Sequence, residues 1–225
     1  MLKIGHRGIP TQFLENSLKG FEYCSEFGAN AIEYDVRTDR DGVFWIMHDR
    51  STKRTCTEAV LVADTATVLL EQIRMCDGST IPKLRTVLER FPYLLHNIEL
   101  KTTAAAALIS FLDETLAEVR FPKEQIVLTS FLPENWPIFA QSRYRFGCLF
   151  EHINEQDIAH IAELQPEFVV LNHVFAEEKT VRSCVDSKLK VWLYTVNDRA
   201  AVRFWKSTEL IDGIISDDFT FLNEM

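Results

Sequence analysis

Two β-rich runs of this 225-residue chain carry acidic and basic side chains at alternate positions. Glu33 and Asp35 lie in "AIEYDV", and Glu99 and Lys101 lie in "NIELK". Residues two apart on a strand point to the same face, so each pair shares a face. Three carboxylates that converge on one site repel each other unless a cation lies among them. Oxygen ligands without cysteine suit a hard divalent cation, Mg²⁺ or Ca²⁺.

Histidine and arginine side chains lie close to these runs. His6 and Arg7 follow the short apolar run "LKIG", and His48 follows the run "FWIM". The guanidinium of arginine can donate two parallel hydrogen bonds to phosphate oxygens. A divalent cation beside Arg7 and Lys101 therefore forms a strong anion site. Two histidines can supply a general acid and a general base near neutral pH. The residues therefore indicate metal-assisted phosphoryl transfer.

Each of these residues taken singly could be an ordinary solvated or structural side chain. We favour a functional site because they occur together, at the ends of three predicted strands and one hairpin. His96, His152 and His160 have no such neighbours, so we expect them at the surface or in packing. Most of the sixteen phenylalanines and four tryptophans belong to the core. Phe131 and Trp192 lie near predicted strand ends, and we expect them to contact a substrate.

The strands that must position these residues alternate with helical runs, which is typical of a parallel β-sheet. Nine strand candidates are present. Only "RTDRDG" separates the second from the third, and Asp41-Gly42 is a hairpin turn signal there. We therefore interpret "VFWIMHD" as an antiparallel return strand, which leaves eight strands for a (β/α)8 TIM barrel. In such a barrel, functional side chains lie at the carboxyl ends of the strands.

The connections between the strands show helical periodicity. The apolar spacing predicts a helix over residues 14–24, with Gly28 as its stop signal. Residues 51–82 are the least regular part of the chain and contain a short helical run at 66–74. We expect them to form an insertion at the C-terminal face, over the active site. No linker divides the chain, so residues 1–225 are expected to form a single domain.

Composition excludes some classes of partner. The net charge of −9 argues against a nucleic-acid binder, which needs a positive surface. Five cysteines occur without a CxxC pair, and the N-terminus shows no secretory leader. We therefore expect reduced thiols and a cytoplasmic protein. No run is long enough for an integral membrane segment, and no pattern indicates an oligomeric state.

Short motifs throughout the chain resemble those of the glycerophosphodiester phosphodiesterase family. A single motif of this kind is weak, but the ordered set is highly specific and runs from end to end. The motifs are "HRG" at 6–8, "ENS" at 15–17, "GANAIEYDVRTDRDG" at 28–42, "HDRSTKRT" at 48–55, "NIELK" at 97–101, "TSF" at 129–131, "LYTVN" at 193–197 and "IISD" at 214–217.

The resemblance implies a barrel hydrolase that cleaves glycerophosphodiesters to glycerol 3-phosphate and an alcohol such as choline, ethanolamine or glycerol. It also implies one divalent cation and a pair of histidines as acid and base. The nucleophile is either water or the substrate's own glycerol hydroxyl. By motif match, the metal ligands are Glu33, Asp35 and Glu99, the acid and base are His6 and His48, and the substrate-binding residues are Arg7 and Lys101 on the phosphate, with Glu15 in a supporting role.

Some positions depart from the family's pattern. Tyr194 stands where the family often has tryptophan before "TVN", and Asp217 is not followed by the usual proline. The motifs that carry the chemistry are intact, whereas these departures concern the substrate end of the pocket. The sequence therefore leaves the alcohol open.

Two alternatives stay open. The sphingomyelinase D/phospholipase D branch shares the His, Glu-x-Asp and His layout, but its members are typically secreted and disulfide-bonded. This chain shows no leader and no paired cysteines, and it has the glutamate and lysine of "NIELK". The second alternative is a non-catalytic barrel that binds a phosphorylated ligand. Such a protein should have lost a histidine or a metal carboxylate, and neither is lost here.

Overall fold

Strands and helices alternate in the computed structural model, which describes residues 1–224 and the side chains of residues 1–222. The strands are β1 (Leu2–His6), β2 (Ala31–Thr38), β3 (Phe44–Ile46), β4 (Leu95–Leu100), β5 (Ile126–Ser130), β6 (Arg145–Phe150), β7 (Phe168–Asn172), β8 (Lys190–Tyr194) and β9 (Gly213–Ser216). The helices are α1 (Leu18–Glu26), α2 (Thr67–Leu70), α3 (Leu84–Arg90), α4 (Ala105–Val119), α5 (Trp136–Ala140), α6 (Glu155–Leu164), α7 (Glu178–Asp186) and α8 (Arg199–Thr208).

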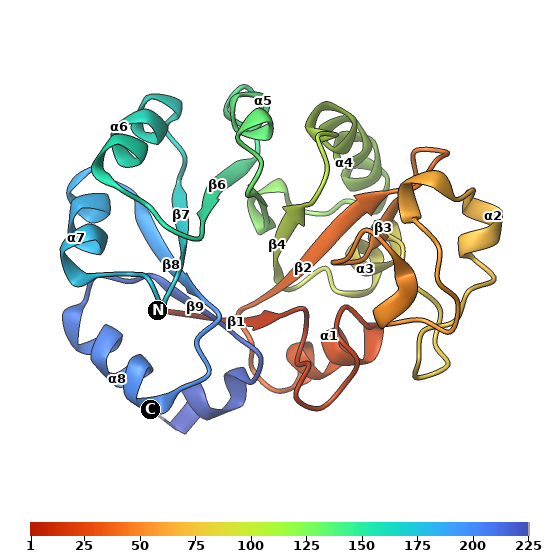
Figure 1. Cartoon of the computed structure of the whole chain (residues 1–225), viewed down its shortest axis with the longest axis horizontal. Coiled ribbons are helices and arrows are strands. Elements are labelled where there is room, and N and C mark those ends of the chain that lie inside the picture. The colour runs from red at the N-terminus through yellow and green to blue at the C-terminus, as the bar shows by residue number, and fades with distance from the viewer. Residues whose placement is uncertain (225) are drawn as a thin grey trace.

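Eight of these strands close into a parallel barrel. Strand β1 pairs in parallel with both β2 and β9, and the remaining barrel strands pair in chain order between them. Helices surround the strands on the outside (Figure 1). The predicted (β/α)8 TIM barrel is confirmed. Over the part of the chain that the structure describes, no helix combines the length and apolar character needed to cross a membrane.

Strand β3 is the predicted return strand and pairs antiparallel with the end of β2. Its tight turn is held by Asp39, whose Oδ1 accepts hydrogen bonds from the N–H groups of Asp41 and Val43, each at 2.9 Å. The pairing continues beyond β3, because the Met47 N–H donates to the Asp35 carbonyl at 2.9 Å. The hairpin therefore returns the chain to the carboxyl end of β2.

Apolar side chains fill two layers of the barrel. One layer lies between the strands and the surrounding helices. In α4, for example, Leu108, Leu112 and Leu116 recur every four residues and are buried there, each contributing about 2 kcal/mol by leaving water. The other layer fills the interior of the barrel. Its buried members are Ile4, Ala31, Val127, Leu149, Phe168, Val170, Trp192 and Ile215.

The chain turns sharply from β1 toward α1 at Arg7 and Gly8, where φ is +48° and +88°. Gly8 is needed there because a Cβ would lie 3.0 Å from the Gly20 backbone. Helix α1 starts only where the Ser17 side chain accepts a hydrogen bond from the Gly20 N–H and caps it. The prediction that this helix starts at residue 14 is therefore wrong.

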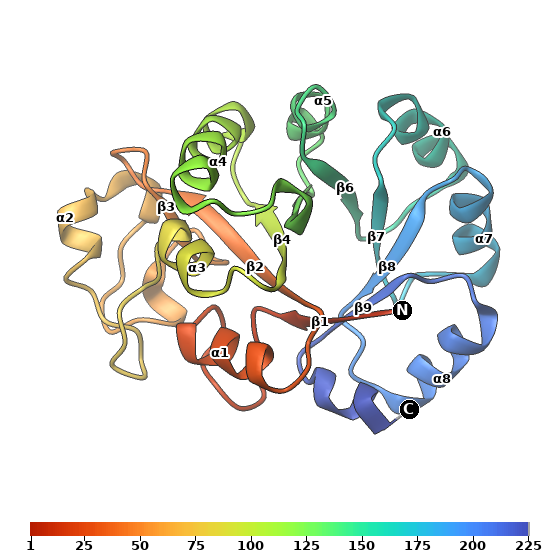
Figure 2. The same cartoon turned by 180° about the vertical axis from the view of Figure 1, so that it is seen from behind.

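The segment 51–82 leaves the barrel between β3 and α3. Figure 2 shows it beside α3 and outside the ring of helices, with α2 at its outer edge. Helix α2 is shorter than the predicted run over 66–74, because Ile73 and Met75 turn inward and the backbone of Met75 forms an antiparallel β-bridge with that of Cys56. These residues belong to a small separate core formed by Trp45, Met47, Cys56, Val62, Leu70, Ile73, Met75 and Ile81.

Trp192 lies in the barrel interior and not at its mouth. Its side chain is fully buried and packs against Phe168, with ring centroids 4.1 Å apart and the ring planes tilted by 38°. Gly213 on the neighbouring strand leaves room for the indole, since a Cβ there would lie 2.7 Å from Trp192 Cδ1. The expectation that Trp192 contacts substrate is therefore corrected. Tyr194, two residues further along the same face of β8, lines the pocket instead.

Candidate active site

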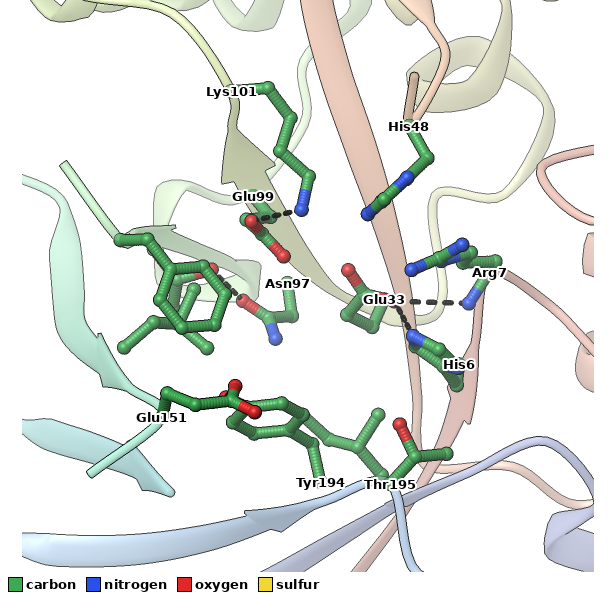
Figure 3. A pocket seen from close by; sticks show the side chains of 14 residues that line it. His6, Arg7, Glu33, His48, Asn97, Glu99, Lys101, Glu151, Tyr194 and Thr195 are labelled. Atoms are coloured by element: carbon green, nitrogen blue, oxygen red, sulfur yellow. Dashed lines mark hydrogen bonds and ion pairs between the residues drawn. The ribbon is translucent and has the colours of Figure 1, made fainter. Parts of the chain in front are cut away.

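A pocket of about 210 Å³ opens at the carboxyl ends of the barrel strands (Figure 3). It brings together side chains from most of the strands and from the hairpin. The residues that line it are His6, Arg7, Glu33, His48, Asn97, Glu99, Lys101, Thr129, Phe131, Leu149, Glu151, Tyr194, Thr195 and Ile215.

Three carboxylates meet on one side of this pocket. Glu33 and Glu99 line it, and Asp35 is fully buried beside them. One oxygen from each of the three lies within 4.8 Å of the others. Glu33 and Asp35 lie two positions apart on β2 and so point to the same face. Glu99 on β4 pairs directly with Asp35 in the strand register. The pairing of these two neighbouring strands therefore creates the cluster.

Burial and charge control how these carboxyl groups ionise. Burial and the charge of Asp35 raise the pKa of Glu33 to about 7. Burial also raises the pKa of Glu99. Burial acts in the same direction on Asp35, but the positive charges of Lys101 and Arg7 outweigh it and lower the pKa of Asp35 to about 2. A cation bound among these carboxyl groups would favour their ionised forms.

The donor set of this cluster fits a hard divalent cation. Asp35 Oδ1 and Glu99 Oε1 are buried, and neither accepts a hydrogen bond within the described part of the chain. Lys101 Nζ lies 3.0 Å from Asp35 Oδ1 and also forms an ion pair with Glu99. Oxygen atoms with free lone pairs and no sulfur or nitrogen ligand are the donors that Mg²⁺ and Ca²⁺ prefer.

Arg7 bridges the carboxylate cluster and the rim of the pocket. Its backbone N–H donates to Glu33 Oε2 at 3.0 Å, and its Nε lies 3.2 Å from Asp35 Oδ2. Its Nη1 donates to Glu15 Oε1 at 3.2 Å. Glu15 does not line the pocket, so the structure places it behind Arg7 and not in contact with a substrate. The left-handed backbone at Arg7 allows both its N–H and its guanidinium to face the site.

His6 is held by the carboxylate of Asp217. His6 Nδ1 lies 2.6 Å from Asp217 Oδ1, and Asn197 Nδ2 donates to Asp217 Oδ2 at 2.6 Å. This partner leaves Nε2 of His6 on the side of Glu33, at 3.9 Å from Oε2. Burial lowers the pKa of His6, but the hydrogen bond with Asp217 and the charge of Glu33 outweigh burial, so that its pKa is raised overall.

His48 is held in a matching way by the residue that follows it. Its Nδ1 lies 2.7 Å from Asp49 Oδ1, and Arg54 Nε donates to Asp49 Oδ2 at 2.7 Å. Burial lowers the pKa of His48, and together with nearby positive charges it outweighs the neighbouring carboxylates. The two histidines thus differ in the direction of their pKa shifts, although each is oriented by a carboxylate.

The structure adds residues whose roles sequence reasoning missed. Asp49 and Asp217 orient the two histidines, Arg54 holds Asp49, and Glu151 lines the pocket opposite the basic side chains. Asp49 adjoins His48 in the sequence, and Arg54 lies in the same motif, so their positions could have indicated a role at the site. No local pattern marks Glu151.

The fold and this site define a class, the (β/α)8-barrel phosphodiester hydrolases. A profile of the glycerophosphoryl diester phosphodiesterase family matches residues 6–220. The chain is also 31% identical to a glycerophosphodiester phosphodiesterase of Caldanaerobacter subterraneus subsp. tengcongensis, over 96% of this chain and 94% of that protein. This chain therefore belongs to the glycerophosphoryl diester phosphodiesterase family of enzymes.

Solved structures share the fold over nearly the whole chain. A glycerophosphodiester phosphodiesterase from Thermotoga maritima superposes with a TM-score of 0.83 at 25% identity, covering 100% of this chain and 98% of that one. An Oleispira antarctica phosphodiesterase, solved with the product sn-glycerol-3-phosphate, superposes with a TM-score of 0.87 at 22% identity. That match covers 98% of this chain and 94% of the other.

Proposed function

We propose that this protein hydrolyses glycerophosphodiesters to glycerol 3-phosphate and an alcohol, with one divalent cation and two histidines as acid and base. One observation carries the proposal. A single pocket combines a carboxylate cluster suited to a cation, two basic side chains and two histidines that each have an orienting carboxylate. Family membership supports the same reaction.

The cation would be held by Glu33, Asp35 and Glu99. Mg²⁺ and Ca²⁺ both suit these ligands. A bound divalent cation supplies positive charge that polarises the phosphoryl oxygens. Arg7 and Lys101 border the carboxylate cluster, and we assign them to the phosphate oxygens.

His6 and His48 line the pocket and are placed to move protons. Each has Nδ1 bound to a carboxylate, so Nε2 is the nitrogen available for proton transfer. One histidine removes the proton from the nucleophile, and the other protonates the leaving alkoxide. Attack by water gives glycerol 3-phosphate directly. Attack by the glycerol hydroxyl gives a cyclic phosphate, which a water molecule must then open to give glycerol 3-phosphate. Arg7 and Lys101 offset the negative charge that builds up on the phosphoryl oxygens.

The decisive experiment measures glycerol 3-phosphate. Purified protein is incubated with glycerophosphocholine, glycerophosphoethanolamine and glycerophosphoglycerol, with Mg²⁺, with Ca²⁺ and with a chelator. We expect release that depends on a metal and is lost with the chelator. No release from any diester with either metal contradicts the proposed reaction, and unchanged release with the chelator contradicts the metal.

Two further arms separate the alternatives. Release of the headgroup from a lysophospholipid, without hydrolysis of the small diesters, would favour the sphingomyelinase D/phospholipase D branch. Binding of glycerol 3-phosphate without any turnover would favour a non-catalytic barrel. We propose in addition that residues 1–225 act as one domain in the cytoplasm. The five unpaired cysteines support this location, and the net charge of −9 disfavours a nucleic-acid partner.

A further inference from the structure

Glu151 gives the pocket a negative side of its own. It follows β6 directly and lines the pocket with Tyr194. Figure 3 shows Glu151 and Tyr194 across the pocket from His48 and Lys101. The pocket therefore has a basic side, to which we assign the phosphate, and an acidic side that the proposed chemistry does not use.

The carboxylate of Glu151 is held in place but not neutralised by its partners. Asn172 Nδ2 donates to Oε1 at 2.8 Å, and the Tyr194 hydroxyl donates to Oε2 at 2.9 Å. Most exposed glutamates are freely solvated, whereas this one is fixed from the ends of two neighbouring strands. Both donors are uncharged, so the negative charge stays available to a ligand in the pocket.

An aromatic wall joins the two sides of the pocket. The rings of Phe131 and Tyr194 meet edge to face with centroids 5.8 Å apart, and Phe131 is 37% exposed. Lys101 Nζ lies over the Phe131 ring, 5.7 Å from its centroid. Aromatic rings next to a carboxylate form a favourable environment for an ammonium group, because the ring face and the carboxylate both attract positive charge.

We infer that Glu151, Tyr194 and Phe131 form a subsite for a cationic alcohol, so that the preferred substrates carry an ammonium headgroup such as choline or ethanolamine. The inference rests on the proposed function, because it takes the phosphate to be held by Arg7 and Lys101. A zwitterionic phospho-alcohol then places its phosphate on the basic side and its ammonium on the acidic side.

The glycerol half of the substrate has a different place in the pocket. Its floor is neutral and is formed by Asn97, Thr129, Leu149 and Ile215. Thr129 Oγ1 donates to Asn97 Oδ1 at 2.8 Å, which leaves the amide nitrogen of Asn97 toward the pocket (Figure 3). Uncharged polar groups suit glycerol hydroxyls, so the charged group Glu151 is free for the headgroup.

The test compares a charged headgroup with its neutral carbon isostere. Wild type and Glu151→Gln are assayed with glycerophosphocholine and with the diester in which a tert-butyl group replaces the trimethylammonium. We expect wild type to prefer the choline diester in kcat/KM, mainly through KM, and Glu151→Gln to reduce that preference about tenfold. Tyr194→Leu should reduce it as well. The matched control Glu163→Gln removes an exposed charge from α6, outside the pocket, and should keep the preference.

An equilibrium measurement separates this inference from the proposed function. Phosphocholine and its neutral isostere are titrated into wild type and Glu151→Gln by calorimetry, with Mg²⁺ present. Tighter binding of phosphocholine to wild type alone supports the subsite even if no diester is hydrolysed. If Glu151→Gln weakens the affinity for both ligands equally, Glu151 binds a part that the two ligands share. If both affinities stay unchanged, Glu151 contacts neither ligand. Both outcomes overturn the inference.

Discussion

Each histidine of the site depends on a carboxylate that fixes its ring. Asp217 binds Nδ1 of His6, and Asp49 binds Nδ1 of His48, at 2.6 and 2.7 Å. A carboxylate on Nδ1 fixes the tautomer and the ring orientation, and it leaves Nε2 for chemistry. Single side chains therefore determine whether the two histidines can act as a pair.

Removal of either imidazole should stop most turnover. We expect His6→Ala and His48→Ala each to lower kcat about 100-fold or more, because general acid–base catalysis contributes about that much. Thermal unfolding should change little, since both rings line the pocket and lie outside the core. His160→Ala, an exposed histidine on α6, is the control. Near-normal turnover in either variant would exclude that histidine from the chemistry.

The metal-free carboxylate cluster should be a source of instability that a cation removes. A saturating divalent cation binds only the folded state, so we expect it to raise Tm by about 5 °C or more. In Glu99→Gln the rise should be much smaller, while Tm without metal should stay at or above that of wild type, because burial already disfavours the charged form of Glu99. Differential scanning fluorimetry with Mg²⁺ or Ca²⁺ measures both, with Glu163→Gln as control. An equal rise in wild type and Glu99→Gln would place the cation elsewhere.

At the scale of elements, the excursion after β3 supports the site from outside the barrel. Arg54 closes a 3-10 turn, Thr52–Arg54, and its guanidinium spans two carboxylates. It donates to Glu15 at 2.5 and 2.7 Å and to Asp49 at 2.7 and 3.1 Å. One of these carboxylates holds Arg7 and the other holds His48. The turn therefore links a phosphate-side arginine to a histidine across the pocket rim.

This arrangement makes Arg54 a positioning residue with a measurable effect. Arg54→Met should lower kcat about 10-fold to 100-fold with a smaller change in KM. The reason is that catalytic groups held in the wrong orientation slow the reaction more than they weaken substrate binding. Arg54→Lys should restore part of kcat, since lysine can hold only one of the two carboxylates well. The neighbouring exposed Lys53→Ala is the control. A change in thermal stability without a change in kcat would reduce Arg54 to a structural role.

At the scale of the whole molecule, packing around the barrel also imposes a pH dependence on stability. His96 is buried between β4 and its neighbours, with Nδ1 at 2.8 Å from the Tyr34 hydroxyl and Nε2 at 2.9 Å from the Phe91 carbonyl. Burial lowers the pKa of His96 to about 4. The folded state thus favours the neutral ring, so its stabilising effect is complete above pH 6.5 and is lost as pH falls toward 4.

The size of this effect can be measured by urea unfolding. The gap between an ordinary pKa of 6.5 and about 4 corresponds to about 3 kcal/mol as an upper bound. We therefore expect wild type to lose more unfolding free energy than His96→Gln between pH 7 and pH 4.5. Groups that titrate in both proteins cancel in this comparison. An equal loss in the two proteins would show that His96 does not contribute to acid sensitivity.

The sequence by itself determined which strands form and which side chains share a face. The period of two put Glu33 with Asp35 and Glu99 with Lys101, and the Asp41-Gly42 turn predicted the return of β3. These features are local, because strand periodicity and turn chemistry act over a few residues. The helix start that was predicted wrongly was local too, but there the Ser17 cap overrode the apolar spacing.

Only the tertiary structure decided how deep each inward side chain lies and which distant residues meet. Trp192 and Tyr194 share a face of β8, yet one fills the interior and the other reaches the pocket. His6 and Asp217 are 211 positions apart and meet because β1 pairs with β9. Alternation along a strand specifies direction but not depth, and the register that closes the barrel sets the depth.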